Sequence, residues 1–165
     1  MINKTLTLLL FFFLTSQIKA QDVVSHDHNH EGHSHHSHHT NEIAIATSPV
    51  YFVNEKELTF AIHFHYLHFI KDSKFGIGLG YEKILDEHNH ETIGIVGSYH
   101  LNEKMSINLS PGVSFENKRN MNFALHIESA YEFSIQNFHF GPVIEFAYDS
   151  EDQHISLGLH IGFGF

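Results

Sequence analysis

A histidine-rich segment near the N-terminus is the first stretch whose residue types could do chemistry. Imidazole is the commonest protein ligand for divalent transition metals. Spacings of one or two residues let several rings converge on one ion. We therefore predict that the segment binds zinc, nickel or copper ions, and the alternative is a solvated spacer with incidental affinity. Its eight histidines are His26, His28, His30, His33, His35, His36, His38 and His39.

Weaker candidates for metal ligands lie further along the chain. His88 and His90 stand among carboxylates in residues 86–91, where they could hold a cation weakly, although a solvated loop tip is more common. No nucleophile–base pair, phosphate-binding loop or paired-carboxylate motif is recognisable, so we do not expect an enzyme. The remaining candidates, on predicted strands, are His126, Glu145 and His160.

Composition restricts the function classes further. The chain has 165 residues, enough for one domain. It has no Cys, so disulfides, thiolate metal sites and Cys nucleophiles are excluded. The 19 acidic residues outnumber the 9 Lys and Arg. This balance argues against nucleic acid as a partner and suits cations.

Strands are the elements that would position these side chains. From residue 42 onward, apolar residues alternate with small or polar ones, and short polar links separate the segments. Most segments reach the roughly 9–11 residues that a tilted membrane strand needs. We predict an antiparallel meander of eight strands. The strands are residues 42–53, 57–70, 74–85, 91–101, 104–116, 121–134, 137–149 and 153–165.

The last strand shows the alternation most strictly, with apolar residues at every second position from Ile155 to the final Phe165. It resembles the closing strand of Gram-negative outer-membrane β-barrels, in which a terminal Phe is read by the barrel-insertion machinery. The chain after residue 42 resembles the small eight-stranded members of that class, with shorter outer loops. The resemblance implies an all-β, up-and-down transmembrane β-barrel without an enzyme site, surrounded by outer-membrane lipid.

The apolar face of the strands is predicted to point outward. The opposite face is crowded with Gly and Ser, which suit a narrow interior and would make a poor soluble surface. An aromatic girdle at the membrane interface would also explain the Tyr residues near strand ends. These are Tyr66, Tyr81, Tyr99, Tyr131 and Tyr148.

The inward face carries charged groups whose pairing depends on register. A turn near Ile135–Gln136 would place His126 opposite Glu145 and Glu132 opposite His139. Two interpretations remain open for these groups. A polar plug, in which each buried charge has a partner, is favoured because the interior is narrow. A His/Glu metal site in the lumen is the sharper alternative.

The first strand is the one whose register the pattern does not define. Ile43 and Ile45 disagree in phase with Val50 and Phe52. A β-bulge near Pro49 is predicted to reconcile the two halves of the strand.

The chain divides into three parts by composition. Residues 1–20 are predicted to be a secretory signal peptide, because a Lys precedes an apolar run that is too short to span a membrane. Residues 21–41 form the histidine-rich segment, which is expected to be disordered without a ligand. Residues 42–165 form the barrel.

The predicted function combines these parts. We expect a monomeric outer-membrane barrel whose histidine-rich segment lies in the periplasm and buffers or handles divalent transition-metal ions. The alternative is a structural or interaction barrel in which that segment is only a spacer.

Overall fold

The strands form a closed β-barrel. The computed structural model describes residues 39–87, 89–116, 120–150 and 152–165. Among these residues, no helix is long and apolar enough to span a membrane. The strand segments are β1 (Asn41–Phe52), β2 (Leu58–Phe69), β3 (Phe75–Ile84), β4 (Glu91–Asn102), β5 (Met105–Glu116), β6 (Asn120–Tyr131), β7 (Phe133–Ile135), β8 (Phe138–Asp149) and β9 (Gln153–Gly164).

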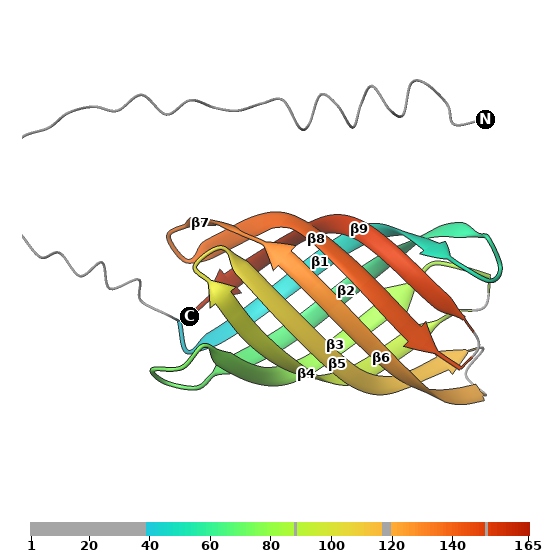
Figure 1. Cartoon of the computed structure of the whole chain (residues 1–165), viewed down its shortest axis with the longest axis horizontal. Coiled ribbons are helices and arrows are strands. Elements are labelled where there is room, and N and C mark those ends of the chain that lie inside the picture. The colour runs from blue at the N-terminus through green and yellow to red at the C-terminus, as the bar shows by residue number, and fades with distance from the viewer. Residues whose placement is uncertain (1–38, 88, 117–119, 151) are drawn as a thin grey trace, which may run out of the picture. The chain divides into compact units, whose positions relative to one another are not determined.

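The barrel has eight strands, because β6 and β7 act as one. Both pair with β8, and they are separated only by Glu132. The register is the same on either side of the break, since Ala130 pairs with Val143 and Phe133 pairs with Phe140. Each strand pairs antiparallel with its neighbour in sequence, and β1 pairs with β9 to close the sheet. The predicted all-β, eight-stranded antiparallel barrel is therefore confirmed (Figure 1).

The two ends of the barrel differ. At the end that we call the terminal end, β1 begins and β9 finishes, as Figure 1 shows. There the backbone N–H of Asn41 donates to the oxygen of Phe165 at 3.0 Å, and the reverse bond is 2.8 Å long. The links β2–β3, β4–β5 and β7–β8 lie at the same end. We call the opposite end, which carries the other four links, the far end.

The outer surface is apolar, as the alternation predicts. The side chains of Leu58, Leu79 and Leu157 are 62–70% exposed although they lie in the middle or at the ends of regular strands. Outward tyrosines gather near both ends. Near the terminal end these are Tyr66, Tyr99 and Tyr131, and near the far end they are Tyr51, Tyr81 and Tyr148. An apolar surface between two tyrosine rows is typical of a barrel in a bilayer.

The first strand runs without the predicted bulge. Its register with β2 is constant from Asn41 to Tyr51. Val50 and Phe52 therefore point into the lumen, where they are 0% and 2% exposed. They pack with Ala61 and Ile84 in an apolar cluster near the far end. The prediction was wrong because it assumed that every large apolar residue faces outward.

The register predicted for the hairpin that joins β6 and β7 to β8 was also wrong. The turn is formed by Gln136 and Asn137, one residue later than expected, and Gln136 adopts a positive φ of 56°. Moving a turn by one residue moves the partner of every strand residue by two. His126 therefore lies opposite Ala147 rather than Glu145. Likewise, His139 lies opposite Ser134 rather than Glu132.

Candidate metal-binding lumen

The lumen holds many carboxylates, and in the described part of the chain imidazoles are the only basic side chains that face them. Among the described residues, every Lys lies outside the lumen, on turns or on an outward strand position. The barrel interior has no permanent positive charge in this part of the chain, so its carboxylates depend on protonated imidazoles or on bound cations. The buried carboxylates of the barrel strands are Glu42, Glu82, Glu128, Glu132 and Glu145.

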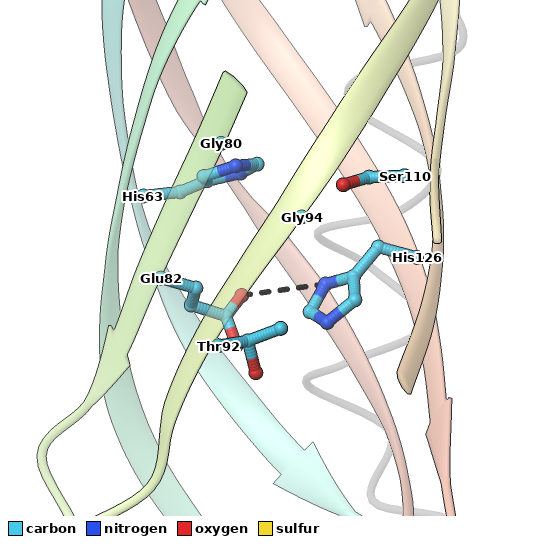
Figure 2. Close-up of a pocket in the computed structure, with 7 residues that line it drawn as sticks. All are labelled: His63, Gly80, Glu82, Thr92, Gly94, Ser110 and His126. Atoms are coloured by element: carbon cyan, nitrogen blue, oxygen red, sulfur yellow. Dashed lines mark ion pairs between the residues drawn. The ribbon is translucent and has the colours of Figure 1, made fainter. Parts of the chain in front are cut away.

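Two of these carboxylates and two histidines form one cluster, which we call the four-ligand cluster. Its residues are Glu82, His126, Glu145 and His154. They come from β3, β6, β8 and β9, and all four are buried. One ligand atom from each lies within 4.8 Å of the others. Figure 2 shows Glu82 and His126 pointing toward each other across the lumen, beside a small cavity that His63 also lines.

The spacing in the four-ligand cluster matches what a tetrahedral ion needs. Bonds of about 2.0–2.2 Å to nitrogen and oxygen place neighbouring ligand atoms about 3.3–3.6 Å apart. His126 Nδ1 lies 3.3 Å from Glu145 Oε1 and 3.8 Å from Glu82 Oε2. His154 Nε2 lies 3.6 Å from Glu145 Oε1 and 3.7 Å from Glu82 Oε1. His126 and His154 face different oxygens of Glu82, so an ion bound by all four residues would require the side chains to move.

Several buried atoms in the lumen have no hydrogen-bond partner, which a plug of paired charges would not leave. They include Glu82 Oε1 and His154 Nε2, and both nitrogens of His160. Separations of 3.6–3.7 Å are close enough for Coulomb attraction but too long for hydrogen bonds. An unsatisfied buried polar atom costs about 1–3 kcal/mol. A coordinated cation would satisfy Glu82 Oε1 and His154 Nε2 together.

A second cluster lies nearer the terminal end and consists of Glu42, His65 and His160. His65 Nε2 and Glu42 Oε1 are hydrogen-bonded at 3.2 Å. The other carboxylate oxygen of Glu42 lies 3.5 Å from His139 Nε2. We call Glu42, His65 and His160 the terminal cluster. His139 lies beside it and is not counted as one of its ligands.

A third group, which consists of His63, Glu128 and Glu145, connects the two clusters. His63 Nδ1 lies 3.4 Å from Glu128 Oε2 and 3.6 Å from Glu145 Oε2. Glu145 therefore belongs both to this group and to the four-ligand cluster. The ring of His63 also contacts that of His65, with centroids 5.8 Å apart. Imidazoles and carboxylates thus follow one another along the lumen.

The structure brings some of the predicted ligands together. His126 and Glu145 are in contact, with a 3.3 Å hydrogen bond, although they are diagonal neighbours and not the directly opposite pair that was predicted. His160 lies in the terminal cluster instead of with them. His39 is described, whereas His88 and the other seven histidines of the N-terminal segment fall outside the described residues, as does the predicted signal peptide. Metal binding by any of them stays a prediction.

Sequence reasoning missed four of the seven ligands in these two clusters. His154 and Glu82 complete the four-ligand cluster, and His65 and Glu42 complete the terminal one. Strand parity could have found the histidines: His63 and His65 alternate with outward Phe64 and Tyr66, and His154 shares a face with His160. Which of the inward residues meet across the lumen depends on barrel closure, which parity does not define.

His90 has a separate role at the far end. Its backbone N–H donates to Asp86 Oδ1 at 3.1 Å, and its ring is hydrogen-bonded to Asp86 Oδ2. Burial alone would lower the pKa of His90, but Asp86, with Asp149 and Glu116 nearby, raises that pKa above its ordinary value. Burial would raise the pKa of Asp86, but the bonds from His90 lower it. The pair closes a loop, and His90 is in none of the clusters above.

Comparison with known proteins supports the fold alone. The sequence matches no protein-family model and no curated protein. Among solved structures, Neisserial surface protein A is similar with a TM-score of 0.57 and 10% identity, over 76% of this chain and 97% of that one. The attachment invasion locus protein Ail of Yersinia pestis matches with a TM-score of 0.55 and 12% identity, over 76% and 97%.

A third similar structure is the N-terminal β-barrel domain of Pseudomonas aeruginosa OprF. Its TM-score is 0.52 at 15% identity, over 77% of this chain and 98% of that one. The chain therefore has the fold of the small eight-stranded Gram-negative outer-membrane barrels.

Proposed function

From the fold of the small outer-membrane barrels, we propose that this protein resides in the outer membrane and binds divalent transition-metal ions. The single observation that carries the proposal is the four-ligand cluster, whose nitrogen and oxygen atoms are spaced for a tetrahedral ion. Two His and two Glu form a suitable donor set for zinc. The histidine-rich segment adds imidazole ligands of the same kind. We propose that the protein buffers or handles such ions.

Electrostatics supports the same proposal. Glu82 and Glu145 each present an oxygen within 4.8 Å of the other's, and both are buried. Two buried carboxylates at this distance repel each other strongly unless a positive charge lies between them. A divalent cation supplies that charge at any pH at which the imidazoles are neutral.

A structural barrel without a metal role is the second candidate. The hydrogen bonds of His126 to Glu145 and of His65 to Glu42 favour it, because protonated imidazoles would pair with these carboxylates. If the barrel is only structural, removing His154 should destabilise the metal-free protein, because losing one partner of a buried pair typically costs about 3–5 kcal/mol. If the barrel binds metal, removing His154 should lower stability chiefly when the ion is bound.

Cobalt spectroscopy of the full mature chain in detergent tests the proposal. Tetrahedral Co²⁺ absorbs visible light much more strongly than Co²⁺ with six ligands, so binding at the four-ligand cluster is distinguishable from binding that leaves the ion with six ligands. We expect one strongly absorbing Co²⁺ per chain, displaced by Zn²⁺. The variant His154→Asn should lose this absorption while keeping the stability of the metal-free protein.

The variant Glu132→Gln is the matched control. Glu132 is an equally buried carboxylate that accepts a 2.7 Å hydrogen bond from Ser106 and belongs to none of the clusters. It should keep the cobalt spectrum. If the wild-type chain shows no Zn²⁺, Ni²⁺ or Cu²⁺ binding tighter than about millimolar by calorimetry, the proposed function fails.

Acid should release the ions from the histidine-rich segment. A proton and a metal compete for the same imidazole lone pair, and free imidazole titrates near pH 6.5. We therefore expect that part of the binding to be lost by about pH 5. Calorimetry across this pH range measures the effect.

A further inference from the structure

Three imidazoles line up along the inward face of β9 at the terminal end. Gly164 and Gly162 are successive inward positions of this strand, and His160 is the next. A Cβ built on Gly164 would fall 2.3 Å from the ring of His39, and one on Gly162 would fall 1.9 Å from the ring of His139. The rings of His139 and His160 are 5.2 Å apart. The two glycines thus make room for the imidazoles.

This line reaches from the histidine-rich segment into the terminal cluster. Gly164, under the ring of His39, pairs with Glu42 of the terminal cluster. His39, His139 and His160 therefore form a series of imidazoles that leads from the terminal end to His160, which is 2% exposed.

The terminal cluster is an incomplete ligand set of its own. Glu42, His65 and His160 each present a ligand atom within 4.8 Å of the others. Neither nitrogen of His160 has a hydrogen-bond partner, and the same is true of His139 Nε2. Three protein ligands leave the fourth position of a tetrahedral ion open to an exchanging group. The four-ligand cluster, in contrast, is filled by its own side chains.

Access to the lumen is also asymmetric. At the far end, Val50, Phe52, Ala61 and Ile84 pack against one another, and the ring of Phe52 contacts that of His154 at 5.4 Å. The same ring contacts that of His90 at 5.5 Å, but His90 is held by Asp86. At the terminal end, imidazoles continue from the terminal cluster to His139 and His39. These imidazoles offer a route for ion exchange at the terminal end.

We infer that Glu42, His65 and His160 form a second divalent-metal site, and that this site exchanges its ion at the terminal end, past His139 and His39. The inference rests on the proposed metal binding by the barrel. It assigns the four-ligand cluster to retention of an ion and the terminal cluster to exchange. His39 acts as a ligand on the route by which the ion enters and leaves the site.

Zinc titration followed by imidazole nitrogen NMR of the full mature chain in micelles tests the site. We expect the resonances of His65 and His160 to shift on zinc binding in the wild type and in His154→Asn, which lacks only the four-ligand cluster. Glu42→Gln should abolish these shifts while His126 and His154 still respond. Shifts of His126 and His154 without any shift of His65 and His160 would overturn the inference and leave the proposed function standing. No shift in either cluster would overturn both.

Release kinetics test the exchange. The zinc-loaded chain is mixed with an excess of a colorimetric chelator, and release from the terminal cluster is followed. His39→Ser should slow both the uptake and the release of zinc by about tenfold, while the zinc affinity of the terminal cluster stays the same because its three ligands are intact. His68→Asn is the matched control, because His68 is an exposed imidazole near the same end that faces away from the lumen. Equal release by His39→Ser and the wild type would show that His39 takes no part.

Discussion

At the scale of single residues, the missing side chains of inward glycines decide where the imidazoles lie. Gly80 makes room for the ring of His63 and for Val96, just as Gly162 makes room for His139. Glycine weakens a strand on its own. The glycines beside these inward rings are therefore needed because a larger residue would leave no space for the rings in the lumen.

Replacing Gly162 by Ala should displace the ring of His139 and destabilise the barrel by about 1–3 kcal/mol, because the added methyl group overpacks the lumen. Urea unfolding in detergent measures the change. Gly97→Ala is the matched control, since Gly97 faces outward and the nearest atom to its added Cβ is 3.8 Å away. That variant should stay within about 0.5 kcal/mol of the wild type. Equal effects of the two would contradict the assignment of faces.

The pair of Asp86 and His90 predicts a pH dependence of stability. The raised pKa of His90 means that its contribution is complete below about pH 6.5 and is lost as the pH rises through the raised value. The lowered pKa of Asp86 means that its contribution is present above about pH 3.9 and is lost as the pH falls through the lowered value. The pair is therefore most stabilising between these limits.

Thermal unfolding in the presence of a chelator checks this window. The difference between the wild type and Asp86→Asn should be largest between about pH 4 and 6.5 and should shrink toward alkaline pH. Asp72→Asn, at an exposed turn of the terminal end, is the control and should show no such maximum. A difference that grew toward alkaline pH would contradict the assignment.

At the scale of elements, period-two alternation is enough to predict the strands and their faces. The predicted strands agree with the observed ones within about two residues at each end, except that Glu132 interrupts the sixth. A regular strand with one apolar face has few alternatives once several neighbours share the pattern. Register is less accessible, because it depends on where a turn centres. Gln136 adopts a left-handed conformation, which the residue type of Gln does not predict. The turn therefore lies one residue later than predicted, and the partner of His126 on β8 differs from the predicted one by two residues.

The terminal strand should be required for assembly. Phe165 makes two backbone hydrogen bonds with Asn41 and places its ring outward against that of Phe163. Deleting Phe165 should reduce the folded fraction in the outer membrane, because it removes both the hydrogen bonds to Asn41 and an outward ring that packs against Phe163. Phe133→Ala removes a similarly exposed outward ring from the same end and is the control. Heat-dependent gel migration of membrane fractions measures folding, and equal folded fractions would argue against the requirement.

At the scale of the whole molecule, two tyrosine rows on either side of an apolar surface fit a bilayer. The exposed apolar residues lie on every strand, as expected of a barrel surrounded by lipid and not of a soluble one. Fractionation of the native host should therefore place the protein in the outer membrane. Recovery of a soluble monomer would contradict the proposed location.

The described basic residues of the interior are all histidines, so the stability of the barrel should depend on the pH and the metal concentration around it. A plug built with Lys or Arg would keep its charge over a wide range of conditions, whereas this lumen takes its charge from ambient protons and ions. Thermodynamic linkage then ties the folding equilibrium to ion supply: an ion at about 100 times its Kd adds about 2.7 kcal/mol per site. The melting temperature of the native barrel would accordingly rise and fall with the free metal concentration around the cell.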